Sequence, residues 1–166
     1  MWTGSPPHEG SCNHDAVEER EQDHREGDLA SPDDSYEWFR RAQMLLEQGN
    51  SDAAAVVLER LRASDPDSTS VVESLARALF DSKRFREAAD AFGTLVDRSP
   101  DDDYAHYGLG LALWRLQDFP GARDHLAVAV VMRPDRPEYA QALAQVRATL
   151  RARAEAGLPE TGPVPT

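Results

Sequence analysis

Apolar residues recur along the middle of the chain at intervals of three, four and seven positions, which is the pattern of helices with one buried face. The first such stretch predicts a helix over about 35–48, with Trp38, Ala42 and Leu45 on its buried face. A second stretch predicts a helix over about 51–64, and the glycine-containing segment between the two predicts a turn. The pattern therefore predicts a helix–turn–helix unit.

This unit returns with a period of 34 residues. Pro66, Pro100 and Pro134 are spaced by that period, and each is placed to end a unit because proline lacks an N–H group and disfavours helix in the residue before it. In the second and third units the predicted buried residues are Val72, Leu75, Ala76, Leu79, Ala88, Phe92 and Leu95, and then His106, Leu109, Gly110, Leu113, Ala122, Leu126 and Ala129.

The period and these positions resemble the tetratricopeptide repeat family, whose pattern asks for a Trp, a Leu-Gly pair, a Tyr, an Ala, a Phe and a Pro. The resemblance implies an all-α fold, namely a right-handed α-solenoid of about seven helices. It would comprise three units (35–68, 69–102 and 103–136) and a C-terminal capping helix (137–153). Three positions depart from the pattern, with Arg41 in a Leu position and Val72 and His106 in the Trp position. We expect these departures to loosen the first and third units.

The ends of the helices carry recognisable residues. Asp67 or Ser68, Asp101 or Asp102, and Asp135 are placed to cap the helices that follow the prolines. Pro120 is expected in the first turn of its helix, where proline is tolerated. In the capping helix we expect Ala140, Leu143, Ala144 and Leu150 to face the stack, with Arg153 among the polar residues around them.

The two ends of the chain differ from its middle in composition. Residues 1–34 hold ten acidic residues and two arginines, have few large apolar side chains and are expected to be a disordered acidic arm. Residues 154–166 are rich in Pro and Gly and are expected to form a flexible tail. The net charge of -12 argues against nucleic acid or an anionic membrane as the main partner, and the single cysteine fits a reducing, cytoplasmic setting. One lysine against 17 arginines is similar to the usage of GC-rich bacterial genomes.

In the family that the chain resembles, the first helix of each unit lines a concave groove that binds other proteins. The resemblance therefore implies a partner protein, held as a peptide or helix, and a groove lined by Tyr36, Phe39, Arg40, Gln43, Ser74, Arg77, Tyr104, Tyr107, Leu111, Trp114 and Arg115. Phe80 and Trp114 could equally be core residues. The positions at which some members bind a C-terminal carboxylate hold Phe39, Gln43, Ser74, Tyr104 and Gly108, so the basic clamp is missing and an apolar or aromatic-rich partner fits better.

Other functions find less support in the sequence. The alternative to a scaffold is a self-associating protein such as a homodimer, or a regulatory subunit, because three units form a short array. No catalytic motif and no metal or cofactor site is predicted; His8, Cys12, His14 and His24 have no zinc-finger spacing, His106 is expected to be packed, and His125 is expected to face outward. The stretch Leu158–Gly162 spells the motif that sortases cleave, but without the segments of a cell-wall signal. The acidic arm could also screen the groove through its charge.

Overall fold

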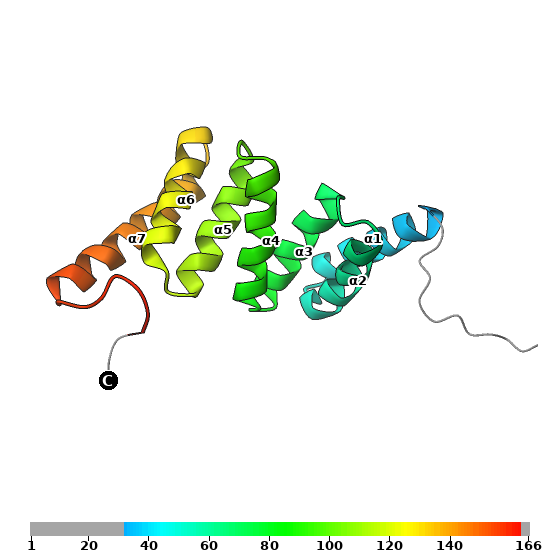
Figure 1. Ribbon diagram of the computed structural model, residues 1–166, viewed down its shortest axis with the longest axis horizontal. Coiled ribbons are helices and arrows are strands. Elements are labelled where there is room, and N and C mark those ends of the chain that lie inside the picture. The colour runs from blue at the N-terminus through cyan, green and yellow to red at the C-terminus, as the bar shows by residue number, and fades with distance from the viewer. Residues whose placement is uncertain (1–31, 164–166) are drawn as a thin grey trace, which may run out of the picture.

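The computed structural model describes residues 32–163, and within that range the protein consists of seven helices and no strand (Figure 1). Residues 1–31 of the predicted disordered arm, its screening of the groove, and the first four metal candidates lie outside this range, whereas residues 32–34 of the predicted arm begin the first helix. The helices are α1 (Pro32–Glu47), α2 (Ser51–Ser64), α3 (Thr69–Asp81), α4 (Phe85–Arg98), α5 (Asp103–Arg115), α6 (Phe119–Met132) and α7 (Pro137–Glu155). The all-α helical repeat solenoid predicted from the sequence is confirmed.

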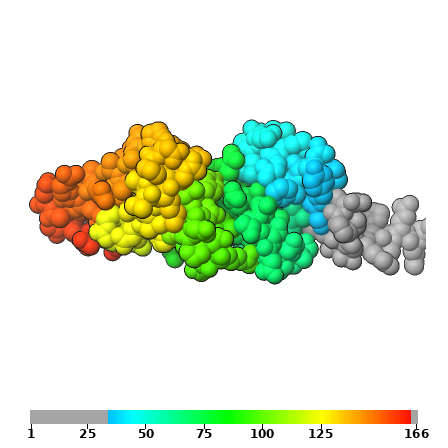
Figure 2. All heavy atoms as spheres, turned by 90° about the horizontal axis from the view of Figure 1, so that it is seen from above, coloured from blue at the N-terminus to red at the C-terminus, as the bar shows by residue number. Residues whose placement is uncertain are grey.

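The helices follow one another in a single row, so that the described part of the molecule is elongated (Figures 1 and 2). Each helix packs against the one before it and the one after it. In addition, α1 contacts α3, α3 contacts α5 and α5 contacts α7, whereas α2, α4 and α6 do not contact one another. The odd-numbered helices therefore converge on the inner side of the row, and the even-numbered helices spread apart on its outer side.

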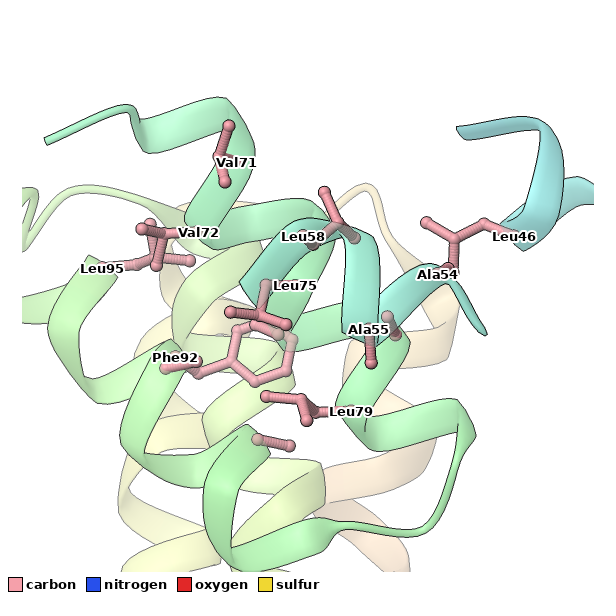
Figure 3. Packing of buried hydrophobic residues seen from close by; sticks show 14 of the residues in the cluster. Leu46, Ala54, Ala55, Leu58, Val71, Val72, Leu75, Leu79, Phe92 and Leu95 are labelled. Atoms are coloured by element: carbon pink, nitrogen blue, oxygen red, sulfur yellow. The ribbon is translucent and has the colours of Figure 1, made fainter. Parts of the chain in front are cut away.

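Small residues set how closely the helices approach. Ala54, Ala88 and Ala122 lie at the same position of α2, α4 and α6, and none of them is exposed to solvent. A Cβ atom at Gly110 of α5 would lie 2.6 Å from Cγ of Leu126 in α6, so this crossing tolerates no side chain. Around these close contacts the larger side chains form two core clusters, and the half-buried Leu113 packs against both. Figure 3 shows Leu75 and Leu79 of the first cluster gathered about the ring of Phe92.

The turns inside the three units are built alike. Gly49, Lys83 and Gln117 each follow the first helix of a unit and have φ values of 76°, 64° and 64°, in the left-handed region. In each turn the next residue donates its backbone N–H to a carbonyl in the last turn of the helix, as Asn50 does to Leu45 at 2.8 Å. The repeat is thus present in the backbone conformation, although glycine occupies only the first of the three positions.

Helix capping follows the sequence prediction only in part. Asp102 caps α5, because its carboxylate accepts a hydrogen bond from the backbone N–H of Ala105 at 3.0 Å. Ser68 occupies the N-cap position of α3 without making a side-chain cap. Asp135 does not cap α7, because the N-cap position of this helix is Arg136, which makes no side-chain cap. Asp135 pairs with Arg133, which lowers the pKa of Asp135 to about 2.

The sequence prediction also missed a cap at the start of α6. Asp118, which the sequence analysis did not single out, caps this helix by accepting from the N–H of Gly121 at 3.2 Å. Pro120 lies in the first turn, as expected. This aspartate ends the third of the left-handed turns and begins the second helix of its unit.

The departures in the first unit are explained by the absence of a helix before α1 in the described range. In α3 the positions that face the preceding unit hold Val71 and Leu75, which are both buried. The equivalent positions of α1, 34 residues earlier, hold Glu37 and Arg41, which are both exposed. Trp38 is 38% exposed, so its expected burial is wrong, and the Arg41 guanidinium lies 5.9 Å from the centre of its ring. Polar residues thus close this end of the stack.

The buried face of α7 differs from the one predicted. Tyr139, Ala142, Leu143 and Val146 are buried against α6 and α5, whereas Ala140 and Ala144 are exposed. In the complete units the positions equivalent to these two alanines face the second helix of the same unit. No helix follows α7 within the described residues, so this face meets solvent, and the burial predicted for Ala140 and Ala144 is wrong.

A histidine pair replaces an apolar contact in the third unit. His106 is buried, as expected, and its Nδ1 lies 3.0 Å from Nδ1 of His125 while its Nε2 lies 3.1 Å from the carbonyl oxygen of Pro100. The prediction that His125 faces outward is wrong, because this side chain is half-buried at the seam between α5 and α6. The same two positions hold Val72 and Ala91 in the second unit, where both side chains are buried.

The segment after α7 lies against the helices, whereas the sequence predicted a loose tail. Gly162 donates its N–H to the carbonyl of Gln117 at 3.1 Å, and Thr161 forms an isolated β-bridge with Asp118. Arg153, expected among exposed polar residues, is buried beneath this segment. The chain therefore folds back from the end of α7 to the turn between α5 and α6.

Candidate binding hollow on the inner wall

A hollow of about 190 Å³ opens between α3 and α5. These are two of the odd-numbered helices that converge on the inner side of the row. Its lining is mostly aromatic and apolar, with one ion pair at its edge: Arg77, Phe80, Asp81, Phe92, Tyr104, Tyr107, Gly108 and Leu111. The volume is below the range of about 300–1,000 Å³ that is typical of small-molecule pockets, so the hollow suits one bulky side chain better than a cofactor.

The floor of the hollow depends on Gly108. A Cβ atom at this position would lie 2.3 Å from Cε1 of Phe92, so the absence of a side chain lets the Phe92 ring from α4 reach beneath α5. Phe92 is 2% exposed and meets the ring of Tyr104 edge to face, with 6.1 Å between the ring centres. The sequence analysis did not assign Phe92 to the groove, since it lies on a second helix.

One wall of the hollow is held from behind by α7. Tyr107 stacks on Tyr139, with 4.3 Å between ring centres and 22° between ring planes. The Tyr139 hydroxyl donates to Oδ2 of Asp103 at 2.8 Å, so this buried polar group is satisfied. Burial and the Asp103 carboxylate both raise the pKa of Tyr139. The capping helix therefore fixes the orientation of a residue in the hollow, a role that the sequence did not reveal.

The charges around the hollow are mostly negative. Nε of Arg77 lies 3.8 Å from Asp81, one turn along α3, and both side chains are largely exposed. Burial raises the pKa of Glu73, and the nearby Asp102 carboxylate raises it further. Burial also raises the pKa of Tyr104, whose hydroxyl is close enough to sense Arg77, Glu73 and Asp81. One arginine thus stands among three carboxylates on this part of the wall.

Four of the eleven residues predicted for the groove line this hollow, namely Arg77, Tyr104, Tyr107 and Leu111. Phe80, which the sequence left between groove and core, lines it too and packs edge to face on Phe85.

The other seven predicted residues do not line the hollow. Tyr36 is 63% exposed, and Arg40 pairs with Glu37. Gln43 donates to the hydroxyl of Ser74 at 3.1 Å, which joins α1 to α3. The remaining three lie elsewhere: Phe39 and Trp114 are half-buried against the core, and Arg115 lies over the ring of Phe85.

Residues 32–163 hold neither a candidate metal cluster nor a candidate membrane span. No cluster of three or more His, Cys, Asp or Glu side chains in that range is arranged to hold a metal ion. No described helix combines the length and the apolar character needed to cross a membrane.

Comparison with protein families places repeats along most of the helical region. Two family models, both described as tetratricopeptide repeat, match residues 37–78 and 73–137. Together they extend from α1 to the start of α7 and include every residue that lines the hollow. No curated protein gave a significant sequence match.

Solved structures with the same fold belong to several proteins. MamA from Desulfovibrio magneticus RS-1 superimposes with a TM-score of 0.70 at 20% identity, over 76% of this chain and 71% of that chain. The first TPR domain of Spaghetti (RPAP3), bound to the HSP90 peptide SRMEEVD, superimposes with a TM-score of 0.67 at 19% identity, over 75% of this chain and 99% of that chain. The Sgt2 TPR domain from Aspergillus fumigatus superimposes with a TM-score of 0.68 at 15% identity, over 84% of this chain and 93% of that chain. At these identities the likeness establishes the fold alone.

Proposed function

Because the chain belongs to the tetratricopeptide repeat family, a family of protein-interaction modules, we propose that it is a non-catalytic scaffold or adaptor. Its partner is a peptide or a helix of another protein, held against α3 and α5 on the inner wall. The hollow of about 190 Å³ carries this proposal, because it is an aromatic-lined recess on the face where the odd-numbered helices converge.

The lining of the hollow specifies the centre of the partner. Phe80, Tyr104, Tyr107 and Leu111 offer apolar surface that remains half-open, while Phe92 closes the floor. A Leu, Met or Phe side chain entering the recess would bury its surface against rings that are already held in place, so that little side-chain entropy is lost on binding. We therefore expect one large apolar residue of the partner to be the anchor.

The charges specify the flanks of the anchor. Asp81 in the lining and Glu73 beside Tyr104 outnumber Arg77, so basic residues beside the anchor are favoured and acidic ones are disfavoured. The peptide in the RPAP3 complex, SRMEEVD, is acidic at its C-terminal end. The positions that would clamp such an end hold no basic residue here, and Gln43 and Ser74 bond to each other. A partner of that kind is not expected for this protein.

A peptide library tests the proposal. A library of random twelve-residue peptides displayed on phage is selected against the full chain, and the affinities of the selected peptides are measured by fluorescence anisotropy. We expect sequences with one large apolar residue flanked by Lys or Arg to be enriched. The SRMEEVD peptide, used as a probe of the acidic class, is expected to bind no better than a scrambled peptide.

A matched pair of variants places the binding site. Leu111→Glu puts a charge into the hollow and is expected to weaken the affinity for the selected peptides by about tenfold or more, because binding would desolvate an unpaired carboxylate. Val131→Glu makes the same type of change at an apolar residue of α6 that is 82% exposed, and is expected to leave affinity unchanged. Equal affinities for the two variants, with circular dichroism showing both folded, would remove the hollow from the proposal.

A further inference from the structure

Arg153 forms an unusual contact at the end of α7. Its side chain is 7% exposed, and its Nε donates to the carbonyl oxygen of Pro159 at 2.6 Å. Its Nη2 donates to the carbonyl oxygens of Gly162 at 2.9 Å and Thr161 at 3.3 Å. The guanidinium carbon lies 5.1 Å from the centre of the Phe119 ring. One arginine thus binds three carbonyls of the segment that follows its own helix.

No carboxylate forms an ion pair with Arg153 within the described range, although its charge is buried. A buried charge is costly unless hydrogen bonds and nearby groups compensate for it, and here the compensation comes from the three backbone carbonyls and the Phe119 ring. If the segment moved away, Arg153 would lose all three acceptors and would have to turn outward to water. Burial of Arg153 and docking of the segment therefore depend on each other.

The docked segment includes the sortase motif at 158–162. The peptide unit between Thr161 and Gly162 is held on both sides, because its carbonyl accepts from Arg153 and its N–H donates to Gln117. Gly162 has a φ of 79°, a left-handed conformation that interrupts an extended strand. Enzymes and binding domains that read short linear motifs generally require an extended segment with free backbone groups. In this conformation the backbone carbonyl of Thr161 and the N–H of Gly162 are not free for such a partner.

The contacts that hold the segment are few compared with the backbone that they order. Leu158 and Gly162 are half-buried, whereas Pro159, Glu160 and Thr161 are exposed. Segments with few buried contacts open locally while the rest of a protein stays folded. We propose that residues 158–162 form a releasable strap latched by Arg153, and that unlatching makes this segment available to a protein that binds or cleaves an extended peptide. The inference is independent of the hollow.

Sortase provides a probe with one target, because the motif occurs once in the sequence. The full chain is incubated with a sortase and an oligoglycine acceptor, and the cleavage rate is followed by mass spectrometry. Arg153→Ala removes the latch and is expected to be cleaved about ten times faster than the unmodified chain, because local opening is no longer opposed. Arg151→Ala, at an exposed arginine of the same helix, is the control and is expected to stay within about twofold.

Amide hydrogen exchange at Gly162 gives an independent reading on the unmodified chain. The latched strap predicts that this N–H exchanges more slowly than in a free peptide of residues 156–166, and that Arg153→Ala removes the difference while circular dichroism shows the helices retained. Exchange at the free-peptide rate in the unmodified chain would overturn the proposal, whether or not the variant folds. Equal cleavage of the unmodified chain and a folded Arg153→Ala variant would overturn it as well.

Discussion

Two glycines in helix interiors, Gly108 in α5 and Gly93 in α4, are expected to respond in opposite ways to the same substitution. Alanine in a helix interior is more favourable than glycine by about 0.5–1 kcal/mol, because glycine loses more backbone entropy on folding. A Cβ atom at Gly93 would meet nothing within 4 Å. Gly93→Ala should therefore stabilise the protein by roughly this amount.

At Gly108 the same Cβ atom would lie 2.3, 2.4 and 2.7 Å from Cε1, Cζ and Cδ1 of Phe92. The ring cannot simply move aside, because Phe92 is 2% exposed and lies between Leu75 and Leu79 (Figure 3). It also meets the ring of Tyr104 edge to face. Overpacking of this kind costs about 1–3 kcal/mol, which exceeds the gain in helix propensity. Gly108→Ala should therefore destabilise the protein by about 1–2 kcal/mol.

Urea unfolding followed by circular dichroism measures both effects against the unmodified chain under one set of conditions. The free energies of unfolding of the two variants should differ by about 1.5–3 kcal/mol, with the unmodified chain between them. A stabilised Gly108→Ala variant would show that Phe92 does not occupy the space beneath α5. Phe92 would then not form the floor of the hollow.

Three further predictions concern the turns, the caps and the histidine pair. Gly49→Ala should lower the free energy of unfolding by about 1 kcal/mol, because φ at this position is 76°, whereas Lys83→Gly should leave it nearly unchanged. Urea unfolding measures both variants, and an unchanged stability of Gly49→Ala would show that the left-handed conformation there is not strained for alanine. In the same assay Asp102→Ala should lower the free energy of unfolding by about 1 kcal/mol, and Asp102→Asn should lower it less, because asparagine can also cap a helix. Equal losses of stability in the two variants would argue against capping by Asp102. Burial and the neighbouring His106 lower the pKa of His125, and the carboxylates of Asp124 and Asp118 oppose this shift only in part. The unfolded chain therefore binds a proton more readily than the folded chain does. As a result, the free energy of unfolding falls as the pH drops below about 6.5, by at most about 1.4 kcal/mol per pH unit. Replacing the pair with the Val and Ala of the second unit should flatten unfolding free energies measured from pH 7.5 to 5.5, and an unchanged slope would contradict this.

The positions of the helices could be predicted from the sequence because two signals agree on them. The apolar period fixes which stretches are helical, and the prolines at 34-residue spacing end each unit, so the predicted second helix of the first unit coincides with α2. Besides His125 and the Asp118 cap in the third unit, errors arose at the two ends of the stack, where an unchanged pattern meets a different set of neighbours. Arg41 and Ala144 occupy repeat positions whose usual packing partner is absent within the described range, and both are exposed.

The hollow and the strap depend on contacts between units, which a single repeat pattern does not contain. Phe92 reaches the hollow from a second helix, through the space that Gly108 leaves open, whereas the sequence rule assigns only first helices to the groove. A glycine inside a helix, 16 residues after a large aromatic residue of the preceding unit, was the available signal. The sequence predicts a surface position for Arg153 because arginine is rarely buried, and nothing nearby in the sequence marks the carbonyls that it binds.

The central claim is that the recess between α3 and α5 receives an apolar side chain of a partner. Chemical-shift mapping of the isotope-labelled full chain, titrated with the tightest peptide from the selection, tests this most directly. We expect the largest chemical-shift changes at Tyr104, Tyr107 and Leu111, and no change at Val131 on α6. The largest changes on α2, α4 or α6, with the residues of the hollow unmoved, would contradict it.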